Sequence, residues 1–191
     1  MEPGTGRTGA RTLVRPTSPQ AQTPSGSLGG VPEDSPAARA LLSTGVPTGV
    51  FQPQKRMESG RFPLVADRID LTEYDGPPGC EAWVVFGWIP QTHLALDLRT
   101  GRVHGFSENG GRVQDLHTDL SSLAHLAFAL HRLLKEFPWS DDEADEEDDF
   151  ERLAEALADI RTSVEERDPL PFSGDSVWPA VLDDMAAGMW S

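Results

Sequence analysis

Residues 93–134 constrain the fold more than any other part of this 191-residue chain. In residues 93–98 every second position is leucine, which is the alternation of a β-strand with one packed face and one wetter face. Arg99-Thr100-Gly101 then suits a hairpin loop, because glycine adopts the positive φ angle needed at the third position. We therefore expect residues 102–106 to return as an antiparallel strand.

The residues after this hairpin predict a third strand and a long amphipathic helix. Asn109-Gly110 is a second turn signal, placed before a strand at 113–116. Thr118 or Asp119 can cap the helix that follows. Apolar residues recur there at spacings of three and four, at Leu120, Leu123, Ala127, Leu130, Leu134 and Phe137. A helix of about 18 residues is roughly 27 Å long, enough to cover one side of a small sheet and close a two-layer core.

Shorter signals predict the remaining elements. Residues 82–86 are rich in β-branched and aromatic side chains, as in a central strand covered on both faces. Segments 62–65 and 69–71 are candidate short strands, and residues 35–45 carry the Ser cap, Pro start and Gly stop of a short helix. Two further helical stripes follow, at Phe150, Leu153, Leu157, Ile160 and Val164 and at Trp178, Val181, Leu182, Met185 and Met189.

These elements predict one α+β domain over residues 34–191, in which a small, mostly antiparallel sheet packs with helices. Residues 1–33 are dominated by Gly, Pro, Thr, Ser and Gln. Ordering such a segment costs conformational entropy that apolar burial does not offset, so we expect a disordered tail. A transit peptide is the less favoured alternative, suggested by the arginines and the scarcity of acids.

Cysteine count and charge narrow the functional classes. The single cysteine, Cys80, forms no internal disulfide, and no apolar run is long enough to span a membrane. Both features favour a soluble, cytoplasmic protein. Residues 1–135 hold 13 acidic and 13 basic side chains, whereas residues 136–191 hold 18 and 3. Direct nucleic-acid binding requires clustered Lys and Arg, so this charge distribution argues against it.

The excess negative charge is concentrated in one run, residues 140–149, which we expect to form an acidic loop. The simplest interpretation is a solvated connection between two helices, whose last acids also favour the positive end of the second helix. The functional interpretation is that its field attracts a basic partner. Its acids, the candidate partner-binding residues, are Asp141, Asp142, Glu143, Asp145, Glu146, Glu147, Asp148 and Asp149.

Catalytic and metal-binding patterns are missing from the sequence. No two of the five histidines stand four residues apart, the helical spacing that would place two ring nitrogens on one metal. There is no Gly-x-Ser-x-Gly elbow and no phosphate-binding Gly-Lys-Ser or Gly-Lys-Thr loop. We therefore expect no enzyme activity, no cofactor and no metal, and keep a hydrolase only as a residual possibility.

The residues of the predicted hairpin and helix start resemble the SUKH superfamily, and most closely its fourth subgroup of immunity proteins. In that subgroup a strand ending in Asp-x-x-Thr-Gly-x-Val leads through another strand to the start of a helix. Asp97, Thr100, Gly101, Val103 and Leu120 fit those places. The segment 41–47 resembles the first helix and Gly-x-Pro turn of that family. Asp168-Pro169 and Trp178-Pro179 resemble its C-terminal segment. His117 replaces a usual Asn, and Leu123 a frequent aromatic residue.

This resemblance implies a single α+β domain that binds and neutralises a toxin delivered by neighbouring bacteria, often a nuclease or nucleic-acid deaminase. The partner would be the cognate toxin domain, with a basic surface, and no catalytic residue is carried over. A second hypothesis is an intracellular scaffold or regulatory module that binds an ordinary protein partner.

Overall fold

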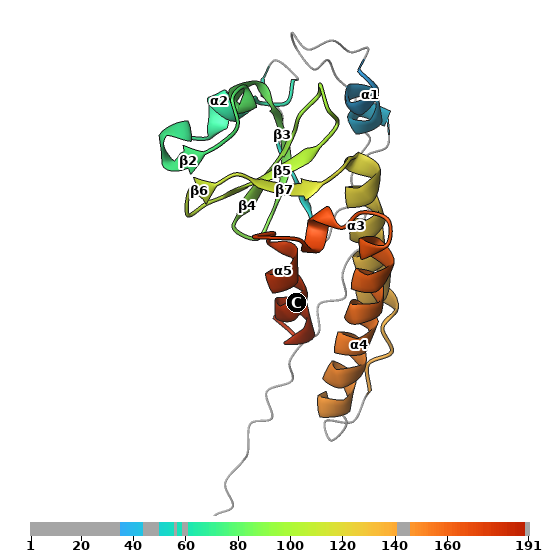
Figure 1. Cartoon of the computed structure of the whole chain (residues 1–191). Helices are drawn as coiled ribbons and strands as arrows, with labels where there is room; N and C mark the ends of the chain where they lie inside the picture. The colour runs from blue at the N-terminus through green and yellow to red at the C-terminus, as the bar shows by residue number, and fades with distance from the viewer. Residues whose placement is uncertain (1–34, 44–49, 56, 59–60, 141–145, 190–191) are drawn as a thin grey trace, which may run out of the picture.

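The computed structural model describes residues 35–43, 50–55, 57–58, 61–140 and 146–189, and its five-stranded antiparallel sheet lies at one end of a bundle of helices (Figure 1). The strand order is β1-β3-β4-β5-β7, with every neighbouring pair antiparallel. A separate parallel pair is formed by β2 and β6. The strands are β1 (Gln52–Pro53), β2 (Tyr74–Asp75), β3 (Val84–Ile89), β4 (Thr92–Leu96), β5 (Val103–Ser107), β6 (Gly111–Arg112) and β7 (Gln114–His117).

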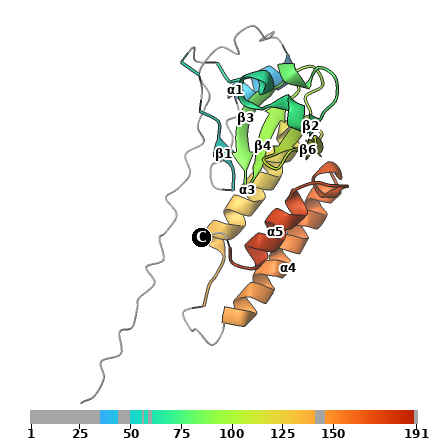
Figure 2. The ribbon, with the colours of Figure 1, turned by 90° about the vertical axis from the view of Figure 1, so that its left-hand side faces the viewer.

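The two longest helices lie side by side and project away from the sheet, with the last helix packed against the second of them (Figures 1 and 2). The helices are α1 (Pro36–Ser43), α2 (Val65–Arg68), α3 (Leu120–Glu136), α4 (Glu146–Glu165) and α5 (Trp178–Ala186). The short 3-10 turns among the described residues are η1 (Leu71–Glu73), η2 (Cys80–Ala82) and η4 (Leu170–Phe172). Together these elements confirm the predicted α+β class.

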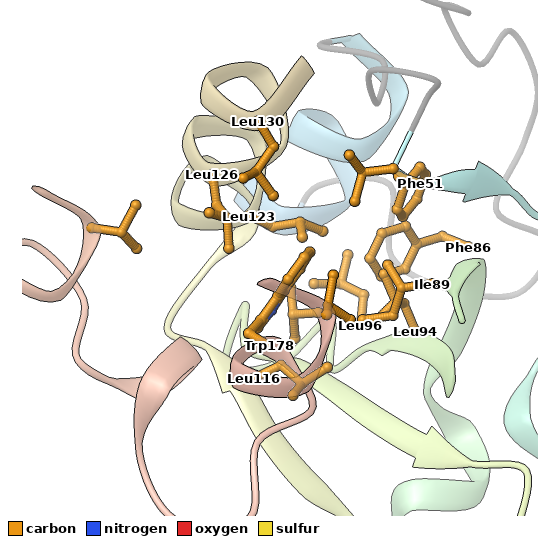
Figure 3. Packing of buried hydrophobic residues seen from close by; sticks show 14 of the residues in the cluster. Phe51, Phe86, Ile89, Leu94, Leu96, Leu116, Leu123, Leu126, Leu130 and Trp178 are labelled. Carbon is orange, nitrogen blue, oxygen red and sulfur yellow. The ribbon is translucent and has the colours of Figure 1, made fainter. Parts of the chain in front are cut away.

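The main core lies between one face of the sheet and the helices (Figure 3). Leu94 and Leu96 of β4 point into it, as the alternation predicts. The α3 stripe is also confirmed, since Leu123, Ala127 and Leu130 are buried. Asp119 caps this helix by accepting a hydrogen bond from the Ser122 backbone N–H at 2.8 Å. Other members of the core are Phe51, Phe86, Ile89, Leu116, Leu126 and Trp178.

The opposite face of the sheet carries a second, smaller cluster. The central-strand prediction is confirmed, because Val84 and Phe86 of β3 enter the main core while Val85 enters the second cluster. The prediction of a wetter face on β4 is wrong, since Ala95 and Asp97 are both buried. The segment from α2 to the residue after η2 covers this face with apolar side chains, among them Val65, Cys80 and Trp83.

The two predicted strands at 62–65 and 69–71 are also wrong, for a local reason. The Asp67 carboxylate accepts a hydrogen bond from the Leu64 backbone N–H at 3.0 Å, and the Asp70 carboxylate accepts one from the Thr72 N–H at 3.1 Å. Each acid therefore caps a short helical turn where apolar content suggested a strand. Sheet pairing is reduced to a single bridge between Leu64 and Val84.

Side-chain hydrogen bonds also explain the β4–β5 hairpin. Gly101 has a φ of 83°, confirming the positive angle predicted for it. The Asp97 carboxylate accepts hydrogen bonds from the Arg99 backbone N–H at 2.9 Å and from the Thr100 hydroxyl at 2.8 Å. The spacing Asp-x-x-Thr-Gly thus encodes one closed turn, in which the acid and the threonine hold the loop that glycine allows.

Truncation of the α3 core should be costly because helix and sheet meet there. Leu130→Ala, at a side chain with no exposed surface, should lower the free energy of unfolding by about 2 to 5 kcal/mol. Phe128→Ala is the matched control, since Phe128 lies on the same helix but is 47% exposed. Urea unfolding followed by circular dichroism measures both. Equal effects of the two truncations would contradict the assigned helix face.

Candidate functional site

The described part of the acidic segment (residues 140–149) is Ser140 and residues 146–149, and the latter form the start of α4, at the end of that helix that points away from the sheet (Figures 1 and 2). Helix α4 begins at Glu146, so the last four acids belong to its first turn and not to a loop. Glu147 and Asp148 are exposed in that turn, where the positive end of the helix dipole favours negative charge. Four predicted site residues lie outside the described residues: Asp141, Asp142, Glu143 and Asp145.

Asp149 differs from the other acids because its carboxylate is used inside the protein. It is only 4% exposed, accepts a hydrogen bond from the Ser140 backbone N–H at 2.6 Å, and pairs with Arg152. The Ser140 hydrogen bond and the Arg152 guanidinium hold the pKa of Asp149 below its ordinary value. Asp149 therefore joins the end of the α3 segment to the first turn of α4.

An exposed tryptophan lies beside these acids. Trp139 is 48% exposed, and its ring packs edge-on against Phe137 and Phe150, with ring centroids 4.7 and 5.9 Å apart. The Arg152 guanidinium lies over the Phe137 ring, 5.6 Å from the ring centroid. A rigidly held, half-exposed aromatic side chain next to charge is a common anchor in protein–protein interfaces.

A groove of about 1350 Å³ lies near the sheet, bordered by the β4–β5 hairpin, the β2–η2 loop, β6, β7 and the loop after η4. We call it the β7 groove. Its lining includes Trp83, Arg99, Arg102, His104, Arg112, Gln114 and Asp115. No sequence motif indicated it, because its walls come from separate parts of the chain between Ser35 and Ser176.

His104 forms part of the groove floor and is poorly paired. Its ring is 5% exposed and stacks on Trp83, with ring centroids 3.9 Å apart. Nδ1 lies 2.9 Å from an Asp115 carboxylate oxygen, but the contact is too bent for a hydrogen bond, and Nε2 has no partner in the described part of the chain. Burial lowers the pKa of His104, against the opposing effect of Asp115, so the ring is neutral at pH 7.

A second buried histidine is fully paired. His117 has no exposed surface; its Nε2 accepts a hydrogen bond from the Trp178 indole N–H at 2.9 Å, and its Nδ1 lies 2.8 Å from the Ser122 hydroxyl oxygen. Since Nε2 accepts, Nδ1 carries the proton and donates it to Ser122. Ser122 in turn donates to the Asp168 carboxylate at 2.6 Å. His117, Ser122, Asp168 and Trp178 thus form one chain of hydrogen bonds, which we call the His117 network.

The His117 network contains Ser, His and Asp but not in a catalytic order. Ser122 lies between the other two and donates its proton to Asp168, whereas a nucleophilic serine donates to the histidine. Asp168 also accepts hydrogen bonds from the Thr118 and Leu170 backbone N–H groups, at 2.8 and 3.1 Å. Burial raises the pKa of Asp168, but these hydrogen bonds outweigh it and leave the pKa below its ordinary value. The arrangement is structural.

Two other features of the described residues bear on function. No group of three or more His, Cys, Asp or Glu side chains there is placed to hold a metal ion. Among the helices of the same residues, none combines the length and the apolar character needed to cross a membrane.

The His117 network should make the protein sensitive to acid. Burial lowers the pKa of His117 from 6.5 to about 3, so below pH 6.5 the unfolded chain takes up a proton that the folded chain refuses. The free energy of unfolding should then fall by about 1.4 kcal/mol for each pH unit between pH 6 and 4. His117→Asn keeps hydrogen-bonding groups at this position but does not titrate.

Urea unfolding of both proteins at pH 7.5, 6, 5 and 4 tests this expectation. The pH 7.5 values give the cost of the substitution itself, and His93 and His104 titrate equally in both proteins, so the difference isolates His117. The expected result is a gap that shifts in favour of the variant as the pH falls. A gap that is constant with pH would show that His117 is accessible to protons.

Comparison with known proteins identifies the family. The family model described as SUKH-4 immunity protein matches residues 24–184, which is most of the chain. The match contains the β4–β5 hairpin and every member of the His117 network, and it begins inside the segment whose composition predicts disorder. No curated protein and no solved structure matches the chain significantly. The chain belongs to the SUKH-4 immunity protein family, and this membership suggests an immunity function.

Proposed function

We propose that this protein neutralises a bacterial polymorphic toxin, a nuclease or nucleic-acid deaminase, by forming a protein–protein complex with it. Membership of the SUKH-4 family supports the immunity role. The single observation that carries the mode of action is the separation of charge along the chain. The residues up to 135 are balanced, and the C-terminal part carries the whole excess of 15 negative charges.

The acidic segment is the proposed contact. Enzymes that act on nucleic acids present basic surfaces to the phosphate backbone. An acidic segment of comparable charge density is attracted to that surface, and by covering it excludes the substrate. The exposed Glu147 and Asp148 stand at the start of α4, and Trp139 lies beside them as a preorganised apolar anchor. Asp149 contributes to the field but keeps its internal partners.

The test is a binding and protection experiment with the candidate toxin encoded beside this gene. The variant changes the seven acids other than Asp149 to Asn or Gln, which removes the field and leaves the Ser140 hydrogen bond intact. The matched control neutralises seven exposed acids elsewhere: Glu58, Glu73, Glu81, Glu108, Glu155, Asp159 and Asp183. The variant's seven are Asp141, Asp142, Glu143, Asp145, Glu146, Glu147 and Asp148.

Association rate constants measured by stopped flow at 50 and 300 mM NaCl distinguish the two variants. The wild-type rate should fall steeply with salt, and at low salt the variant should associate about tenfold more slowly than the control, because both carry the same net charge. Cells expressing the toxin should be rescued by the wild-type protein and less well by the variant. Equal rates for variant and control would remove the acidic segment from the contact. Binding without rescue would instead favour the scaffold hypothesis.

A further inference from the structure

We propose that the β7 groove receives an extended segment of the toxin, which adds as a further strand along the free edge of β7 and presents a carboxylate side chain to Arg112. This inference rests on the proposed function for the identity of the partner. It concerns a different surface, since the groove is lined by residues of β7 and its neighbours. Glu147 and Asp148 lie instead at the start of α4, at the end of that helix far from the sheet (Figure 1).

The first observation is a strand edge that is free along half its length. β7 is the last strand of the sheet and pairs only with β5. Within the described ranges, no backbone hydrogen bond joins residues 114–117 to any segment other than β5. η4 packs near β7, but Gln114 and Asp115 line the groove. Unpaired N–H and C=O groups on an edge strand are a template for another extended chain.

The second observation is a pair of buried polar groups that lack partners at the same place. The Nε2 atom of His104 and the Oε1 atom of Gln114 are both inaccessible to solvent and make no hydrogen bond in the described structure. A buried polar atom without a hydrogen-bond partner destabilises the folded state until a ligand supplies one. Both side chains line the groove. Gln114 belongs to the edge strand itself, so a chain added along β7 brings backbone N–H groups next to its Oε1 atom.

Size and charge identify the occupant. Pockets for small molecules measure about 300 to 1000 Å³, and this groove exceeds that range, which favours a polypeptide segment. Arg112 is exposed and has no ion pair or side-chain hydrogen bond among the described residues. Arg99 and Arg102 hold Asp97 and Asp115 only loosely, at 3.6 and 3.7 Å. Asp75 and Asp175 also line the groove, so the surface fits one carboxylate at Arg112 and not an anionic polymer.

The experiment uses the full chain and the same toxin in two measurements. Isothermal titration gives the affinity of Arg112→Glu and of Arg68→Glu, a matched control that makes the same charge change at another exposed arginine. Hydrogen–deuterium exchange reports protection of the backbone amides of β7, residues 114–117, in the complex. We expect Arg112→Glu to weaken binding by about tenfold or more, Arg68→Glu to stay within about twofold, and the edge amides to become protected.

Each result decides between the two proposals. Unprotected edge amides, or equal affinities for the two arginine variants, would overturn the groove inference. If the acidic-segment variant still associates slowly in that case, the proposed function stands without the groove. Failure of the wild-type protein to bind the toxin would overturn both. Protection of the edge together with a normal association rate for the acidic-segment variant would support the groove and remove the acidic segment.

Discussion

The Asp168 carboxylate holds together elements on which the rest of the structure depends. It lies just beyond the turn that ends α4, and it accepts hydrogen bonds from Thr118 and Ser122, at the start of α3, and from Leu170, at the start of η4. Through Ser122 it orients His117 of β7, which in turn receives the Trp178 indole at the start of α5. The Asp168 carboxylate therefore connects α3 and η4 directly, and α5 through His117, to the last strand of the sheet. Its negative charge is balanced by hydrogen-bond donors and not by a buried cation.

This arrangement explains why the domain tolerates the buried polar side chains of the His117 network. A buried carboxylate or imidazole is costly only where its hydrogen bonds are unmet, and the members of the His117 network satisfy one another. His104 is the contrasting case. It is almost as deeply buried, yet its pairing with Asp115 is bent and its second nitrogen has no partner. The polar atoms are thus paired where the helices are assembled, and His104 and Gln114 keep unpaired atoms where the groove meets the edge strand.

Much of the fold could be predicted from the sequence, because its strongest signals are local. The β4 alternation, Gly101, the Asp119 cap and the α3 stripe each report a periodicity or a φ angle set by neighbouring residues. The errors arise where a single acid decides, as when Asp67 and Asp70 cap turns in a segment whose apolar residues suggested strands. The β7 groove could not be predicted, since its walls come from parts of the chain between Ser35 and Ser176 that meet only in the folded protein. The members of the His117 network are visible in the sequence only as separate family marks.

The hydrogen bond from Ser140 to Asp149 has a consequence for the residues between them. It brings two positions nine residues apart into contact, so the two ends of the acidic segment are held together. A segment with fixed ends has fewer accessible conformations than an open tail of the same length, and therefore loses less conformational entropy when a partner immobilises it. Asp149 would then assist binding through its hydrogen bond to Ser140 and not through contact with the partner.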